Sequence, residues 1–235
     1  MRASSGELIL AWLRERYPLR TFAPLAVLLA AASVATSDGS TTGFSAVAWS
    51  AALALLLVLA FRLWDDLEDV PSDRIEHPRR VLPNAASRAP FVALLGVASA
   101  GAAAGVFARP AAMPRLATAV AGCAALFLWY RYRAVVGADA SVNAHVVLLK
   151  YPLIAWLVTP GGHDREWTAV LAPLALVYLA LCVHEALHDP RIRRAPRVRR
   201  VIAIESALLC LVAVHALLVL AKPFVFAELT RGTAP

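Results

Sequence analysis

Long apolar runs alternate with short polar segments along the whole chain of 235 residues. Seven runs approach the roughly 20 residues that a helix needs to cross the hydrocarbon core of a bilayer. They lack the polar faces that the helices of a soluble bundle would show. We therefore predict an all-α, polytopic membrane bundle of about seven transmembrane helices. The predicted spans are residues 19–35, 44–64, 90–108, 114–130, 143–159, 167–187 and 201–221.

Composition supports a membrane protein over a soluble domain. Hydrophobic residues make up 60% of the chain and charged residues 17%, and the mean hydropathy is +0.65. Residues 1–235 show no internal repeat, linker or second domain, so we expect one domain. Cys123, Cys182 and Cys210 all fall within predicted spans without metal or disulfide spacing, and we expect them to be packing residues.

The basic residues predict the orientation. With a cytoplasmic N-terminus, the inside segments carry 16 basic residues and the outside segments 5, as the positive-inside rule requires. We expect a multi-pass protein of the cytoplasmic (inner) membrane without a cleaved signal peptide. We therefore attribute the net charge of +7 to membrane topology and to affinity for anionic lipids, and not to nucleic-acid binding. Residues 8–16 either lie along the membrane interface or extend the first span.

Six of the sixteen acidic residues fall in residues 65–76, directly after the second predicted span. Such dense carboxylates repel one another unless a cation lies among them, although an arbitrary acidic run is more often a solvated loop. Asp66, Asp69 and Asp73 stand at i, i+3 and i+7, the spacing of one helix face. Basic residues at 74–80 offer donors to a phosphate. The pattern predicts a hard, oxygen-ligated cation such as Mg²⁺.

A second acidic pair ends the sixth predicted span. Glu185 and Asp189 stand at i, i+4 on a helix, and six arginines follow before residue 201. In the predicted topology both acidic segments reach the cytoplasmic side. Two acidic clusters flanked by arginine at one membrane face would suit a diphosphate with its metal ions.

Residues 65–83 read DDLEDVPSDRIEHPRRVLP. This run resembles the first signature of the UbiA superfamily of intramembrane prenyltransferases, an Asn-Asp-x-x-Asp-x-x-x-Asp motif with a basic His-Pro-x-Arg tail. In that family the signature follows the second helix and an Asp-x-x-x-Asp motif follows the sixth. Here Glu185-x-x-x-Asp189 stands at the second place.

The resemblance implies a helical fold with a central cavity, across which the two acidic motifs face each other. Carried over by position, Asp66, Asp69 and Asp73 would hold one Mg²⁺, and Glu185 and Asp189 a second. The two ions would bridge the diphosphate of an isoprenyl donor. An allylic carbocation would form as the diphosphate departs, and a lipophilic or aromatic acceptor would attack it.

Further residues are candidates for contact with the substrate. Lys150 is the strongest, because a base within a span is costly unless it is paired, although structural pairing or snorkelling would also explain it. Tyr130 with Arg133 resembles a pair that the family carries after its fourth helix. The whole set is Asp65, Arg74, Arg79, Arg80, Tyr130, Arg133, Lys150, His184 and His188.

Aromatic residues near the span ends either shield a carbocation or anchor the chain at the membrane interface. They are Trp64, Trp129, Tyr132, Tyr151, Trp156 and Tyr178. Asn143 is either a helix cap, which we favour, or a binding residue.

The chain departs from the family pattern in four ways. Asp65 replaces Asn, and Glu185 replaces Asp. Pro71 falls inside the first motif and disfavours helix at Val70, which affects the placement of Asp73. Seven spans stand where the family has nine, so the cavity wall would be open or closed by a second copy of the chain.

A zinc protease is the rival interpretation. His184-Glu185-x-x-His188 fits the pattern in which two histidines bind Zn²⁺ and the glutamate is a general base, with Glu205 as a third ligand. This motif leaves the longer acidic run at 65–83 unexplained. We therefore favour a Mg²⁺-dependent prenyltransferase, with a terpene cyclase of the same family, the protease, and a membrane scaffold or transporter as alternatives. The acceptor and the donor length stay open.

Overall fold

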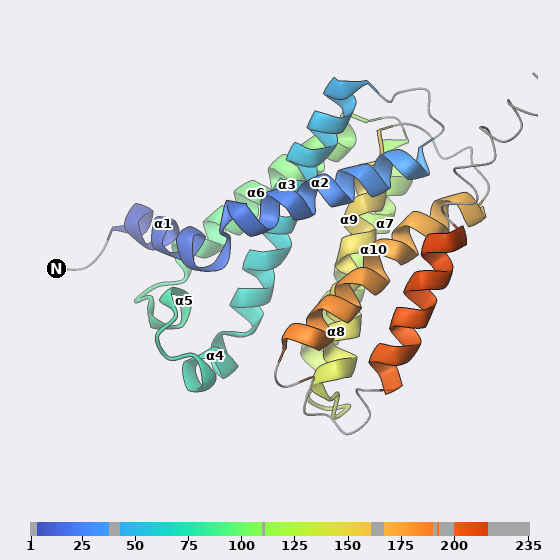
Figure 1. The fold of residues 1–235 in the computed structure, drawn as a ribbon. Coiled ribbons are helices and arrows are strands. Elements are labelled where there is room, and N and C mark those ends of the chain that lie inside the picture. Colours follow the sequence, from blue (N-terminus) through green and yellow to red (C-terminus); the bar gives the residue numbers. More distant parts are fainter. Residues whose placement is uncertain are drawn as a thin grey trace, which may run out of the picture.

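The computed structural model describes residues 4–37, 43–109, 111–160, 167–189, 192 and 200–215, and all regular secondary structure within these ranges is helical (Figure 1). Within these ranges, six segments are long and apolar enough to cross a membrane. They are α2 (Leu19–Thr36), α3 (Phe44–Glu68), α6 (Ala89–Phe107), α7 (Ala112–Tyr132), α8 (Ala140–Leu148) continued by α9 (Lys150–Leu157), and α10 (Trp167–His188). The predicted all-α class is confirmed, and the first six predicted spans match these segments.

The seventh predicted span lies only partly within the described residues. Residues 200–215 are helical, and residues 216–221 lie outside the described ranges. The count of seven spans therefore stays a prediction. The orientation in the membrane and the difference from the family's nine spans also stay predictions.

The six segments pack in a ring. Contacts run from α2 to α3, α6, α7, α9, α10 and back to α2. α9 also touches α3, and its buried residues Ile154 and Leu157 join the core that the ring encloses. The six spans therefore form one bundle around a shared apolar core.

A separate helix, α1 (Ser5–Arg16), precedes the first span. Ser4 and Glu7 form a capping box at its start, and it ends at Tyr17 before Pro18. Pro18 is the residue from which α2 begins, so α1 is not a simple extension of that span. Trp12 is fully buried in the core, which fixes α1 against the bundle.

Two short helices follow α3. α3 ends at Glu68, and α4 (Val70–Glu76) begins directly after Asp69 with Pro71 in its first turn. Proline suits that place because its missing N–H would be unpaired there in any case. The chain therefore bends at Asp69 and continues as helix, then forms α5 (Val81–Asn84).

The fifth span is interrupted at Leu149, between α8 and α9. Pro152 has no N–H for the carbonyl of Leu148, and its ring would clash with that carbonyl in a continuous helix. Lys150 begins the second half of the span and is buried.

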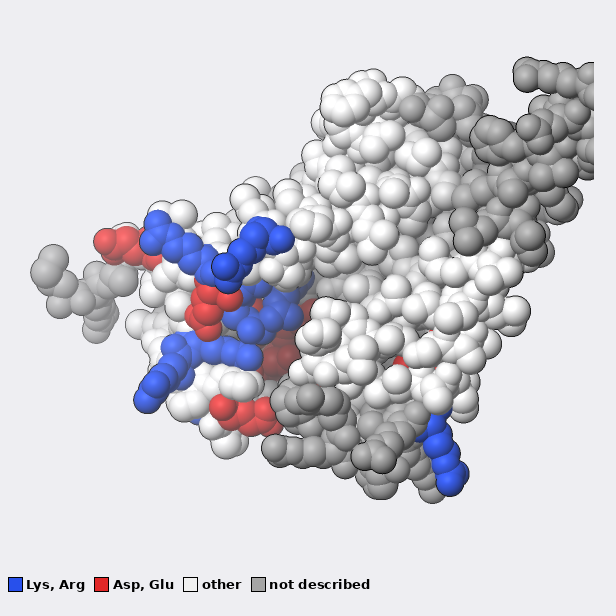
Figure 2. Space-filling model, viewed as in Figure 1, with Lys and Arg blue, Asp and Glu red and all other residues white. Residues whose placement is uncertain are grey.

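Charged residues concentrate at one end of the molecule. Figure 2 shows them over α1 and the region from the end of α3 to α5, while most of the other described residues on the visible face are uncharged. This distribution suits a bundle with its apolar faces in lipid and one polar end.

Candidate functional site

A polar cavity of about 610 Å³ opens at the charged end of the bundle. Seven acidic and five basic side chains contribute to its wall, from α1, α3, α4, α7, α8, α9 and α10 and from the segments beside them. The acids are Asp65, Asp69, Asp73, Glu76, Asp139, Glu185 and Asp189, and the bases are Arg16, Arg62, Arg80, Arg133 and Lys150. The structure thus brings residues of both predicted acidic motifs to one cavity, namely Asp69 and Asp73 of the first and Glu185 and Asp189 of the second.

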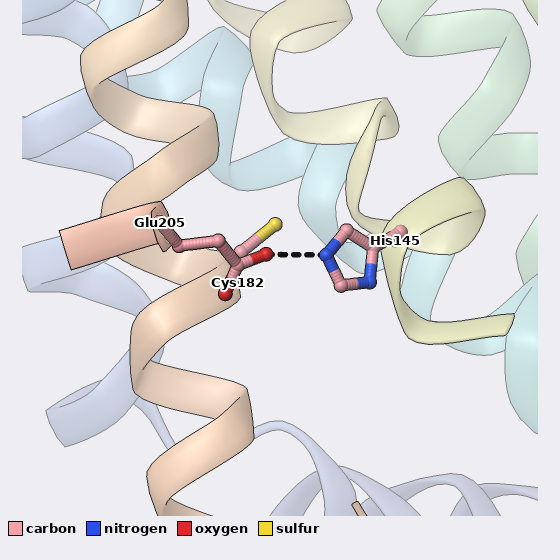
Figure 3. Close-up of side chains that lie close together, drawn as sticks. All are labelled: His145, Cys182 and Glu205. Atoms are coloured by element: carbon pink, nitrogen blue, oxygen red, sulfur yellow. Dashed lines mark hydrogen bonds and ion pairs between the residues drawn. The ribbon is translucent and has the colours of Figure 1, made fainter. Parts of the chain in front are cut away.

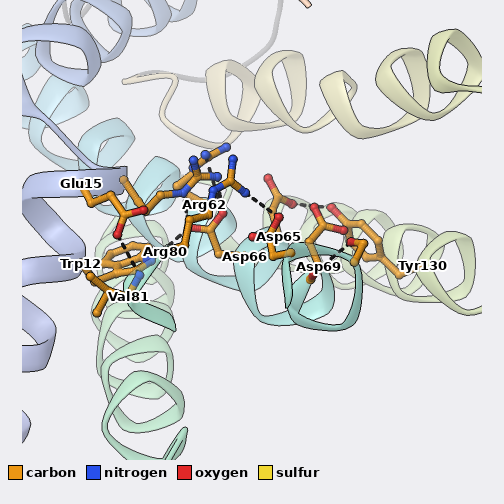
Figure 4. Close-up of polar contacts among 12 residues, drawn as sticks. Trp12, Glu15, Arg62, Asp65, Asp66, Asp69, Arg80, Val81 and Tyr130 are labelled. Atoms are coloured by element: carbon orange, nitrogen blue, oxygen red, sulfur yellow. Dashed lines mark hydrogen bonds and ion pairs between the residues drawn. The ribbon is translucent and has the colours of Figure 1, made fainter. Parts of the chain in front are cut away.

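Asp65 is buried within this network. Its carboxylate accepts hydrogen bonds from the Lys150 ammonium and the Tyr130 hydroxyl, and all three residues are at most 9% exposed. Figure 4 shows Asp65 pointing toward Tyr130. Lys150 therefore does not snorkel to the surface, because it is paired inside the protein.

The next two carboxylates of the motif also have basic partners. Arg133 donates to Asp69 at 2.6 Å and Arg80 donates to Asp73 at 2.6 Å. Burial raises the pKa of Asp69 above its ordinary value, and the nearby carboxylates of Asp65 and Asp73 add to this rise, while Arg133 opposes it. Asp65, Asp69 and Asp73, called the cavity carboxylates below, stand at i, i+4 and i+8.

Asp66 has different partners and is not among the residues that line the cavity. It accepts from Arg16 at 2.8 and 3.0 Å and from the Trp12 indole at 3.0 Å, and Arg62 lies 3.6 Å away (Figure 4). Burial by itself would lower the pKa of Arg16, but its bonds and attraction to Asp66 raise it. Asp66 therefore ties α1 to the end of α3.

The second motif divides into two faces. Glu185 and Asp189 line the cavity, as the resemblance implied. His184 and His188 are exposed, their rings stack at 4.1 Å, and neither lines the cavity. Glu205, the third ligand of the rival zinc motif, contacts His145 instead.

Some predicted binding residues lie elsewhere, and some lining residues were missed. Arg74 and Arg79 are exposed and do not line the cavity. Arg62 and Arg16 line it without having been predicted. Arg62 carried a usable signal, since it is a base within a span four residues before Asp66. Arg16 carried none, because its partner is 50 residues away.

The aromatic candidates also separate. Tyr151 lines the polar cavity, with the Lys150 ammonium 5.5 Å from its ring centroid. Trp129 donates to Asn143 at 3.0 Å. Asn143 is not the cap of α8, because Asp139 holds that place and accepts from the backbone of Val142.

Four other aromatic candidates lie outside the polar cavity. Tyr132 is exposed, Trp156 is half-buried, and Tyr178 donates to the backbone of His145. Trp64 lines a different, apolar cavity.

That apolar cavity, of about 330 Å³, lies between α3, α6, α7 and α9. Its wall includes Phe61, Trp64, Ala102, Ala119 and Leu157. The Trp64 ring meets the Tyr130 ring edge to face at 5.8 Å between centroids, and Tyr130 lines the polar cavity. One aromatic contact therefore stands between an apolar and a charged chamber.

No protein-family model, curated protein or solved structure matches this chain.

Proposed function

We propose that the protein is a magnesium-dependent intramembrane prenyltransferase that ionises an isoprenyl diphosphate in the polar cavity. The observation that carries the proposal is the wall of that cavity, which combines acids and bases beside an apolar chamber. A metal-bound diphosphate requires carboxylates for the metal and cations for the phosphate oxygens. An isoprenyl chain requires apolar surroundings.

The donor atoms of the wall fit Mg²⁺. Among the residues that the structure describes, they include seven carboxylates, which exceed the five bases by two. Mg²⁺ typically takes one or two carboxylates, water and substrate phosphate, so the acids need not be clustered in advance. The cavity carboxylates, with Glu185 and Asp189 from α10, are the proposed ligands of two ions.

The basic residues of the wall are the proposed partners of the phosphate oxygens. Lys150, Arg133 and Arg80 each contact one of the cavity carboxylates. In the proposed complex these bases bind phosphate oxygens and release the carboxylates to the metal. The exchange keeps every charge paired, which matters because an unpaired charge in a buried site is costly.

Ionisation breaks the bond between the allylic carbon and the diphosphate oxygen, and the electron pair leaves with the diphosphate. Bound Mg²⁺ supplies positive charge that stabilises this leaving group. Lys150, Arg133 and Arg80 hold the diphosphate by charge-assisted hydrogen bonds. The Tyr151 ring at the cavity wall and the Trp64 ring, which contacts Tyr130 of that wall, offer π faces to a carbocation.

The apolar cavity is the proposed site of the isoprenyl chain. It is lined by α3 and α7, which also carry Asp65 and Tyr130 of the polar cavity. A donor with its diphosphate among the bases would reach the apolar chamber past Tyr130 and Trp64. The two chambers together match the two halves of an isoprenyl diphosphate.

Product analysis tests the proposal. Purified protein is incubated with geranyl, farnesyl or geranylgeranyl diphosphate and Mg²⁺, with and without a pool of aromatic and lipid acceptors, and products are identified by mass spectrometry. A prenylated acceptor is expected. A hydrocarbon or terpene alcohol formed without acceptor would assign a cyclase, and no consumption of any donor would overturn the proposal.

A further inference from the structure

A second cluster of potential metal ligands lies outside the polar cavity. His145 on α8, Cys182 on α10 and Glu205 on the helix of residues 200–215 come together, as Figure 3 shows. One donor atom from each lies within 4.8 Å of the others. None of the three lines the polar cavity.

The surroundings of His145 fix which of its ring nitrogens faces the cluster. Nδ1 lies 2.7 Å from the carbonyl oxygen of Ser141, and since a carbonyl only accepts, Nδ1 carries a hydrogen. Nε2 faces the carboxylate of Glu205. A histidine that binds a metal typically donates its other N–H to a backbone carbonyl in this way.

This arrangement requires a positive charge between His145 and Glu205. If the imidazole is neutral, its Nε2 lone pair faces the oxygens of a carboxylate, which is repulsive. Either a proton or a metal ion must occupy the space between them. The second carboxylate oxygen, Oε2 of Glu205, is buried and has no hydrogen-bond partner among the described residues. A proton shared with His145 would leave that oxygen unsatisfied, which is costly.

A divalent metal satisfies all three side chains. Cys182 is 2% exposed, and its sulfur becomes a thiolate when it binds a metal and releases its proton. A thiolate, a carboxylate and a neutral imidazole then balance the two charges of Zn²⁺. A neutral cluster is the form that a buried site tolerates best.

We propose that His145, Cys182 and Glu205 bind Zn²⁺ or a similar borderline transition metal. The mixed nitrogen, sulfur and oxygen donors favour zinc over magnesium, which takes oxygen ligands. Three protein ligands leave a fourth, open position. The site joins the helix of residues 200–215 to α8 and α10, where Ile202 and Ala144 both pack against the buried cluster of Ala186 and Ile192. It is separate from the proposed magnesium site and does not depend on it.

Metal analysis tests this site on the full chain in detergent. The protein is stripped with a strong chelator, incubated with Zn²⁺ or Co²⁺ in excess Mg²⁺, freed of unbound metal and measured by mass spectrometry. We expect about one zinc per chain and, with Co²⁺, the absorption of a cobalt–thiolate bond. Cys182→Ser and Glu205→Gln should lower the affinity at least about tenfold, since each removes a ligand atom or its charge.

Matched controls locate the metal. Cys123→Ser removes a half-buried cysteine that lies outside the cluster and should leave zinc binding unchanged. His184→Ala with His188→Ala should also leave it unchanged. Zinc lost from that double variant but kept by Cys182→Ser would place the metal in the rival motif and overturn the proposal. No zinc above background in the wild-type protein would overturn it as well.

A measurement on the wild-type chain covers the case in which Cys182→Ser fails to fold. Thiol alkylation is followed at Cys182 and Cys123 by peptide mass spectrometry with and without Zn²⁺. Zinc should slow alkylation of Cys182 at least about tenfold and leave Cys123 unaffected. Equal rates at Cys182 in both conditions would contradict the site.

Discussion

Asp65 and Asp66 are neighbours in the sequence but face different parts of the protein. Asp65 contacts Lys150 and Tyr130 within the cavity, whereas Asp66 contacts Arg16 and Trp12 of α1. The first arrangement offers oxygens to an entering ligand. The second joins two helices through a buried charge. Loss of the Asp65 carboxylate should therefore affect mainly activity, and loss of the Asp66 carboxylate mainly stability.

Asp66→Asn should therefore reduce stability more than it reduces chemistry. The substitution leaves the half-buried guanidinium of Arg16 without its charge partner, which typically costs about 1–3 kcal/mol. Thermal unfolding in detergent measures the loss. A double-mutant cycle with Arg16→Gln should show a coupling above about 0.5 kcal/mol, the lower range for residues in contact.

The opposite outcome for Asp66 would restore its assignment as a metal ligand. That outcome is wild-type stability together with complete loss of pyrophosphate release. Glu68→Gln is the matched control, because Glu68 is acidic, lies two residues away and does not line the cavity.

His184→Ala should leave pyrophosphate release within about twofold of wild type. The residue is exposed and stacks on His188 away from the cavity wall, so its removal changes no lining group. Initial rates with farnesyl diphosphate give the measurement. Complete loss of activity in His184→Ala, with Asp69→Asn still active, would overturn the roles assigned to the two motifs.

Residue spacing predicted that the first motif contributes to the site, but it did not predict which of its carboxylates line the cavity. Asp66, Asp69 and Asp73 fit one helical stripe, and Asp65, Asp69 and Asp73 fit another. The bend at Asp69 removes the continuous helix on which that choice depended. Asp66 is fixed by Arg16, a partner 50 residues away that no local pattern reveals.

At the scale of elements, the interruption between α8 and α9 places a base at the cavity. Pro152 prevents a continuous helix, and Lys150 stands at the start of α9 with its ammonium on Asp65. The break also lies in the wall, since Leu148 and Tyr151 on either side of Leu149 line the cavity.

Pro152→Ala should lower activity, and it should also lower stability, because Lys150 leaves its buried partner Asp65. Alanine restores the N–H that the Leu148 carbonyl lacks and removes the ring clash, so α8 and α9 can join and turn Lys150 away from Asp65. We expect at least about a tenfold fall in pyrophosphate release, since Lys150 is a proposed phosphate contact. Thermal unfolding and initial rates are measured on the same preparation.

The control for this change is Pro24→Ala, which removes a proline inside α2 at a residue that does not line the cavity. It should keep wild-type rates. Full activity in Pro152→Ala would show that the break does not position Lys150.

The six matched spans were predictable because the apolar length of a membrane helix is a strong signal. Prolines explain most of the differences. Pro18 separates α1 from α2, Pro71 starts α4, and Pro152 divides the fifth span. The sequence marks where such breaks occur, but the direction that the chain takes afterwards depends on packing.

At the scale of the whole molecule, two chambers of opposite character meet at one aromatic contact. The polar cavity is lined by seven acids and five bases, and the apolar cavity by side chains of α3, α6, α7 and α9. A substrate with a charged head and a long apolar tail fits this pairing. The length of tail that the protein accepts should then depend on the apolar cavity alone.

Ala119→Phe should shift the preference toward shorter donors. Ala119 lines the apolar cavity but not the polar one, so an aromatic ring there occupies tail volume and spares the diphosphate site. We expect the ratio of rates with geranyl and geranylgeranyl diphosphate to rise about tenfold or more. An unchanged ratio in folded Ala119→Phe would separate the apolar cavity from donor binding.

The most direct measurement of the central claim is pyrophosphate release from farnesyl diphosphate by the wild-type protein and Asp69→Asn. Wild type should release pyrophosphate with Mg²⁺ or Mn²⁺, lose this activity with a strong chelator and keep it with a zinc-selective chelator. Asp69→Asn should be at least about a hundredfold slower at unchanged stability, while Glu68→Gln stays active. Release that needs zinc, or that persists in Asp69→Asn, would contradict a magnesium–diphosphate site in the polar cavity.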